Sequence, residues 1–178
     1  MKWKLAAIVA AAVAMPAMAD WDEAFDGDLS DLESDPTFIA MSAGDNFVDG
    51  VIGGDDFNDA FTFTIGAGEL LVGIDVVTYM VTGGNTSTGF NMALGSSWDG
   101  DFGNPALIGS LAMDTSYVGT NLLDDPAFGG ALGPGDYTVG LREGTAGQIY
   151  SFNFRVTPTP GTAGLLGLGA LVGMRRRR

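Results

Sequence analysis

Hydrophobic and polar residues alternate with a period of two along much of the chain between residues 37 and 156. The alternation is cleanest in 61–65, 137–141 and 150–156, and this period predicts β-strands with one buried face. Weaker or less regular candidates occupy 38–41, 47–52, 70–81, 90–94 and 106–111. The segment 70–81 is long and rich in β-branched residues, which is typical of a central strand that is buried on both faces.

Clusters of Gly, Asp, Asn and Ser separate these segments, and regular short strands with such turns favour a sandwich or a barrel. We therefore predict an all-β fold for residues 37–156, an antiparallel, jelly-roll-like β-sandwich of about eight strands. The apolar positions of the alternating segments are the predicted core: Phe61, Phe63, Ile65, Leu71, Ile74, Val76, Tyr137, Val139, Tyr150, Phe152 and Phe154.

Residues 1–19 have the three parts of a secretory signal peptide, which predicts an N-terminal signal helix. Lys2 and Lys4 precede an Ala-rich apolar run, and the small residues Ala17 and Ala19 frame a cleavage site before Asp20. We expect the Sec export machinery to recognise this segment, and an uncleaved membrane anchor is the alternative. The acidic segment 20–36 then leads into the predicted sandwich.

Residues 157–178 form a second segment of three parts, which begins with Pro158, Thr159 and Pro160. An uncharged, Gly-rich run follows, and it predicts a short transmembrane helix with flanking arginines at the lipid surface. The large apolar side chains of this run, with its first residue, are Ala163, Leu165, Leu166, Leu168, Leu171 and Val172. The chain closes on Arg175, Arg176, Arg177 and Arg178, which the positive-inside rule keeps in the cytoplasm.

The order of these three parts resembles the PEP-CTERM sorting signal of exported bacterial proteins, with threonine where that family usually has glutamate. The resemblance implies an exosortase, which is a membrane protease, as a partner. It also implies a transient inner-membrane intermediate, followed by release to the cell surface or the extracellular matrix and association with exopolysaccharide. A plain C-terminal anchor that holds an envelope protein in the membrane is the alternative.

The body carries a second resemblance. Residues 57–68 and 132–139 resemble two stretches of bacterial pre-peptidase C-terminal domains, and 27–31 with 35–37 resembles the opening of exported proteins that carry a PEP-CTERM tail. The resemblance implies a secreted β-sandwich module that is not itself catalytic.

The charge excludes several classes of function. The chain has 22 acidic and 8 basic residues, and only two of the basic ones, Arg142 and Arg155, lie between residues 20 and 156. Binding to nucleic acid needs many Lys and Arg contacts, so we expect no nucleic-acid partner. Without histidine or cysteine, and without lysine in the exported body, the usual activated nucleophiles are absent. We therefore expect no enzymatic activity, with a carbohydrate-active enzyme that uses paired carboxylates as the alternative.

Acidic pairs across a glycine suggest calcium as the one candidate cofactor. Asp26 with Asp28, and Asp99 with Asp101, resemble halves of calcium loops, because carboxylates two residues apart can converge on one hard cation. Asp55, Asp56 and Asp59 form a third acidic cluster just before a predicted strand. A solvated acidic surface that keeps the protein soluble is the alternative for all three.

Trp98 lies in a loop that combines aromatic, amide and carboxylate groups. We expect a half-buried tryptophan that caps the end of the sandwich, since tryptophan is mostly buried on average, and stacking on a sugar ring is the alternative. Taken together, the sequence predicts an exported, non-enzymatic cell-surface or matrix protein that meets polysaccharide.

Overall fold

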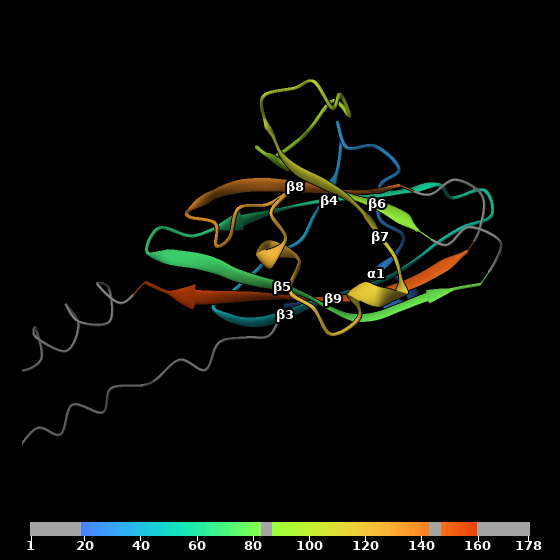
Figure 1. The fold of residues 1–178 in the computed structure, drawn as a ribbon, viewed down its shortest axis with the longest axis horizontal. Coiled ribbons are helices and arrows are strands. Elements are labelled where there is room, and N and C mark those ends of the chain that lie inside the picture. The colour runs from blue at the N-terminus through green and yellow to red at the C-terminus, as the bar shows by residue number, and fades with distance from the viewer. Residues whose placement is uncertain (1–18, 83–86, 143–146, 160–178) are drawn as a thin grey trace, which may run out of the picture.

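Two β-sheets lie face to face in the computed structural model, which describes residues 19–82, 87–142 and 147–159 (Figure 1). One sheet has the strand order β1-β3-β9-β5, with β1 (Ala19–Asp22), β3 (Gly44–Ile52), β9 (Gln148–Pro158) and β5 (Glu69–Val81). The other has the order β2-β4-β8-β6-β7, with β2 (Thr37–Phe38), β4 (Asn58–Ile65), β8 (Gly135–Arg142), β6 (Thr88–Leu94) and β7 (Leu107–Met113). The prediction of an all-β, two-sheet fold is confirmed, with nine strands in the described residues.

Helical structure in the described residues is short: α1 (Glu23–Asp26) and the 3-10 helices η1 (Thr115–Tyr117) and η2 (Leu122–Asp124). None of these helices is long and apolar enough to cross a membrane. The predicted signal helix and the predicted C-terminal hydrophobic helix lie outside the described residues.

The pairing is antiparallel through the centre of both sheets and parallel at one edge of each. β3–β9, β9–β5, β4–β8, β8–β6 and β6–β7 are antiparallel, whereas β1 runs parallel to β3 and β2 runs parallel to β4. The two short parallel strands belong to the N-terminal part of the chain, which therefore covers one edge of each sheet.

Aromatic side chains from both sheets meet in the core. Every core residue that the alternation predicts is buried, with at most 4% of its surface exposed. Phe154 of β9 meets Phe61 and Phe63 of β4 edge to face, with ring centres 5.7 and 5.3 Å apart, and Phe152 meets Phe90 in the same way at 5.4 Å. Edge-to-face pairs each add about 0.5–1.5 kcal/mol beyond the area that they bury, so these contacts join the two layers firmly.

β5 lies at the edge of its sheet, so the prediction of a central strand buried on both faces is wrong. Its side chains alternate, and Val77 and Met80 are exposed. The segment after β7 covers this edge instead of a strand: the backbones of Leu71 and Leu132 exchange two hydrogen bonds, and Val76 bonds to Gly119 and Thr120. Paired in this way, the edge offers few free backbone groups to other chains.

Both ends of the described chain are tied to the sheets. In the acidic lead, Leu29 is buried and Ser30 pairs with Ala60 of β4. At the other end, β9 continues to Pro158, and the amide and hydroxyl of Thr159 both donate to the carbonyl of Gly68. The sandwich therefore includes the lead and the first two residues of the predicted sorting motif.

Candidate functional site

Three carboxylates, two from the acidic lead and one from β4, meet beside the end of β3. Glu23 is the first residue of α1, Asp28 follows that helix, and Asp59 lies in β4. One oxygen of each lies within 4.8 Å of the others, and this is the one group of three or more potential metal-binding side chains among the described residues. Glu23 is half-buried, Asp28 is exposed and Asp59 is fully buried.

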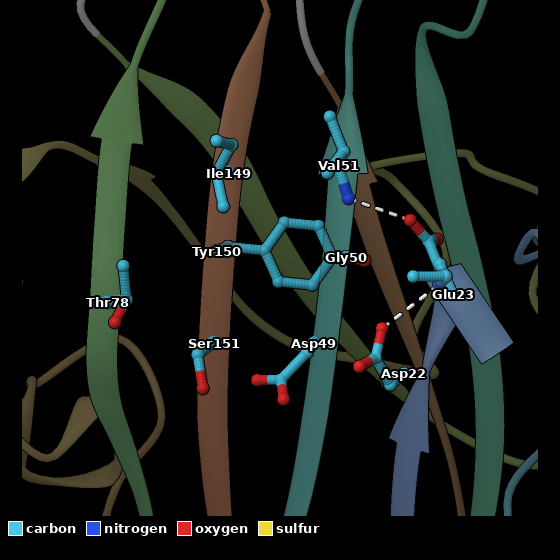
Figure 2. Close-up of a pocket in the computed structure, with 10 residues that line it drawn as sticks. Asp22, Glu23, Asp49, Gly50, Val51, Thr78, Ile149, Tyr150 and Ser151 are labelled. Carbon is cyan, nitrogen blue, oxygen red and sulfur yellow. Dashed lines mark hydrogen bonds between the residues drawn. The ribbon is translucent and has the colours of Figure 1, made fainter.

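Glu23 reaches the cluster because the edge of β3 is free beyond its pairing with β1. The last residues paired between the two strands are Asp22 and Asp49. The next outward-facing amide, that of Val51, donates to Oε2 of Glu23 at 2.7 Å (Figure 2), and the amide of Leu29 donates to Oε1 at 3.4 Å. Glu23 thus replaces the missing strand partner and turns its carboxylate toward Asp59.

Asp59 is held from the opposite sheet by Tyr150 of β9. The phenol hydroxyl donates to Oδ2 of Asp59 at 2.7 Å. The ring extends from β9 across Gly50 of β3 (Figure 2), which is its partner in the sheet. A Cβ at residue 50 would lie 2.2 Å from the phenol oxygen, so this path requires glycine.

Burial raises the pKa values of the carboxyls in and around the cluster. Burial is the main cause that raises the pKa of Asp59 to about 8, against the lowering effect of the Tyr150 hydrogen bond. Burial, followed by a hydrogen bond with Asp31, raises the pKa of the adjacent Asp56 to about 7. The pKa of Glu23 is also raised, first by burial. Oδ1 of Asp59 and Oδ1 of Asp56 are buried without a hydrogen-bond partner.

No cation of the body neutralises this cluster. The two basic residues between positions 20 and 159 are Arg142 and Arg155. Arg142 forms an ion pair with Glu33, and Arg155 forms a bidentate ion pair with Asp75. The cluster can therefore relieve its charge only by taking up protons or by binding a cation from solution.

The four aspartates of the predicted calcium pairs occupy different places. Asp28 belongs to the cluster, whereas Asp26 lies outside it and accepts from the amide of Asp22. Asp99 and Asp101 lie in an exposed loop, and each accepts a hydrogen bond from the amide two residues further on. A second bond to Asp99 comes from Asn104, and these bonds lower the pKa of Asp99. Neither Asp99 nor Asp101 belongs to the carboxylate cluster.

The sequence places Asp56 and Asp59 in an acidic cluster but does not connect them with the lead, and nothing in it singles out Glu23. A usable signal was present for Asp59, because a carboxylate directly before the alternating run of β4 sits where a buried side chain is expected. No sequence signal points to Glu23, since its position depends on the free edge of β3.

Trp98 is buried, with 2% of its surface exposed, so its ring offers no platform for stacking on a sugar. The Arg142 guanidinium lies 5.2 Å from the centre of the indole ring, and Phe102 meets the ring edge to face at 5.7 Å. The indole N–H donates to the carbonyl of Asp101 at 3.2 Å. Trp98 therefore packs against the end of the sandwich, as expected of a capping tryptophan.

A shallow hollow of about 370 Å³ lies beside the cluster over β3 and β9 (Figure 2). Asp22, Glu23 and Asp49 contribute carboxylates to its lining, and Thr78 and Ser151 contribute hydroxyls. Asp59 is not among the lining residues. The hollow and the cluster thus share Glu23, but the buried carboxylate does not face the hollow.

No family model matches this chain, and no curated protein does.

Proposed function

We propose that this chain is an exported, non-enzymatic protein of the cell surface or extracellular matrix, sorted through its PEP-CTERM-like tail and associated with exopolysaccharide. One observation supports the proposal: the described strands, from β1 at Ala19 to β9 ending at Pro158, form two sheets that need no residue beyond the predicted sorting motif. Removal of both ends would leave the sandwich nearly whole.

The strand order supports the assignment to the jelly-roll-like sandwiches that the pre-peptidase C-terminal resemblance implies. In β3-β9-β5 and β4-β8-β6-β7, successive strands alternate between the sheets, except that β6, β7 and β8 follow one another in the same sheet. This order is that of an eight-stranded jelly roll in which irregular backbone, from Gly119 to Leu132, takes the place of the strand beside β5. Jelly rolls of this type commonly serve as binding modules, lectin domains among them.

The carboxylate arrangement favours this proposal over a carbohydrate-active enzyme. A glycosidase needs two carboxyl groups on either side of a bound sugar. Glu23 and Asp59 do approach each other, but Asp59 is fully buried and does not line the hollow, so a sugar cannot lie between them. The absence of histidine and cysteine from the sequence removes the commonest alternatives.

Processing within the predicted sorting motif has a structural requirement. Pro158 is paired with Glu69, and Thr159 is bonded to the carbonyl of Gly68. A protease that cleaves between Pro158 and Pro160 needs extended, accessible backbone, so the last residues of β9 must detach from β5 before cleavage.

Intact-mass measurement of the protein recovered from its native cells tests the proposal. We expect a mass that corresponds to a start at Asp20 and an end near Pro160. A mass that still includes Arg178 would identify the tail as an ordinary anchor. In parallel, Arg175–178 can be replaced by neutral residues: a sorting signal then fails, whereas a plain anchored protein keeps its location.

Association with polysaccharide needs its own measurement. The processed protein should co-sediment with exopolysaccharide purified from the same cells and should leave the polysaccharide chemically unchanged. Release of shortened sugar chains during the incubation would support the enzyme alternative.

A further inference from the structure

We propose that Glu23, Asp28 and Asp59 bind one calcium ion, which joins the N-terminal lead to the sandwich. Two of these ligands belong to the lead, on either side of the end of α1, and the third belongs to β4. Their oxygens lie within 4.8 Å of one another. This site differs from the two aspartate pairs that the sequence suggests and shares only Asp28 with them.

An independent observation points to a ligand at this place. Asp59 has no exposed surface, and its Oδ1 has no hydrogen-bond partner, although the carboxyl group is directed at Glu23 and Asp28. Buried polar atoms are almost always paired, and an orphaned one calls for an explanation such as an ion. Tyr150 occupies Oδ2 of Asp59 and thereby leaves Oδ1 as the free atom.

The donor atoms select a hard cation of the size of calcium. All three ligands are carboxylate oxygens, a set that suits magnesium, calcium or manganese rather than softer metals. Calcium accepts flexible geometry with bonds of about 2.4 Å, so three oxygens that lie within 4.8 Å of one another can share one calcium ion. Magnesium demands near-ideal octahedral geometry and gives up its waters reluctantly, so a site with three protein carboxylates favours the larger ion. Water and backbone carbonyls complete calcium shells of six to eight oxygens in other proteins.

The charge around the site also favours a divalent ion. Asp56 and Asp28 both add negative potential at Asp59, and the two arginines of the body pair elsewhere. Four carboxylates without a cation repel one another, whereas a divalent ion between them attracts each of the four.

The bound ion would hold the N-terminal lead against β4. Without it, the lead is held near the cluster by the two backbone bonds to Glu23, by buried Leu29 and by the pairing of Ser30 with Ala60. Bound calcium adds a direct link between the lead and β4, and any ligand that binds only the folded state stabilises that state by mass action.

Calcium titration of the full-length chain, stripped with EDTA and then desalted, tests this proposal. Isothermal titration calorimetry with calcium chloride should show one ion per chain. At a calcium concentration about 100 times the Kd, the melting temperature should rise by about 5–10 °C at constant ionic strength. Magnesium chloride at the same concentration should give a clearly smaller rise.

Three substitutions of equal charge change locate the ion. Asp59→Asn and Asp28→Asn should each weaken calcium binding at least tenfold, whereas Asp99→Asn should leave it unchanged. Asp59→Asn puts a neutral group of the same shape in place of the carboxyl, so it should fold at least as well as the parent chain without calcium, and loss of its calcium response cannot be ascribed to misfolding. Asp28 is exposed and provides a second variant that the fold tolerates.

Three results would overturn the proposal. The first is the absence of stoichiometric calcium binding up to 5 mM, a concentration above the weakest Kd known for extracellular modules, about 1 mM. The second is a loss of affinity in Asp99→Asn equal to that in Asp59→Asn, which would place the ion in the loop of Asp99 and Asp101. The third is an equal response to magnesium, which would contradict the choice of ion.

Discussion

The hydroxyl of Tyr150 and the carboxyl of Asp59 join the two sheets through a hydrogen bond of 2.7 Å. Tyr150 belongs to β9 in one sheet, and Asp59 belongs to β4 in the other. Both side chains are buried, and the bond fills one oxygen of Asp59 while the other has no hydrogen-bond partner. The ionisation of this one carboxyl group therefore bears on the stability of the whole sandwich.

In calcium-free buffer, stability should fall as the pH rises from about 4 to about 8. The pKa of Asp59 is raised to about 8 in the folded protein, against about 3.9 in an unfolded chain. The folded state thus holds the proton more tightly, and its advantage is complete below pH 4 and lost as the pH passes 8. Urea unfolding at pH 5, 6.5 and 8.5 in EDTA should show a loss on the order of 3–5 kcal/mol from Asp59.

The other titratable groups around Asp59 either lower the stability in the same way as the pH rises or keep their protonation state. Glu23 and Asp56 also have raised pKa values, and Tyr150, whose pKa is raised well above its usual value, stays protonated throughout. Asp59→Asn is the control, because it keeps the shape and removes the titration. Equal slopes of stability against pH in the parent chain and in this variant would contradict the assignment.

Gly50→Ala should destabilise the protein by about 2 kcal/mol or more, because inserted atoms in a packed site force side chains out of place. The new methyl group would lie 2.2 Å from the Tyr150 oxygen and would push the phenol away from Asp59. Gly133→Ala is the matched control, since nothing lies within 4 Å of its Cβ position. Thermal unfolding of the two variants should differ clearly, and equal melting temperatures would show that Tyr150 has another low-energy path.

Arg142→Met should cost more stability than Arg155→Met, although both remove one ion pair. Glu33, the partner of Arg142, is only 7% exposed, and Arg142 also covers the ring of Trp98. Removal of Arg142 leaves a nearly buried carboxylate unpaired, which costs about 2–4 kcal/mol. The pair of Arg155 with Asp75 is more exposed, and such pairs contribute about 1 kcal/mol or less. Urea midpoints that are equal, or in the reverse order, would contradict this ranking.

Sodium chloride should raise the melting temperature of the calcium-free protein. The segment 20–156 carries 22 acidic residues against two arginines, and this self-repulsion destabilises the compact state. At 0.15 M salt the screening length is about 8 Å, so most of the long-range repulsion is lost. A thermal series from 20 mM to 0.5 M sodium chloride measures the effect, with sucrose as an uncharged additive for comparison. A melting temperature that is flat or falls with salt would refute the prediction.

Alternation along the chain was sufficient to find the core and the strands from β3 to β9, because the side-chain period of a β-strand is a local property, but it did not find β1 in the acidic lead. Phe61, Phe63 and Ile65 occupy every second position and are all buried. The lateral order of the strands is not local. The β-branched run of β5 looks like a central strand, yet it lies at an edge whose backbone is satisfied by residues 119–132.

The amino-acid sequence is enough to predict a two-sheet β fold and its core. It also shows an excess of negative charge that the body's own two arginines cannot balance. It also showed acidic pairs such as Asp26 with Asp28, because neighbours in sequence are visible without a structure. Which carboxylates meet is visible in the folded structure alone: Glu23 lies at a free strand edge, and Asp59 reaches it from the opposite sheet. The reason is physical, since the approach of two oxygens depends on how the sheets pack and on whether a residue such as Gly50 leaves room for Tyr150.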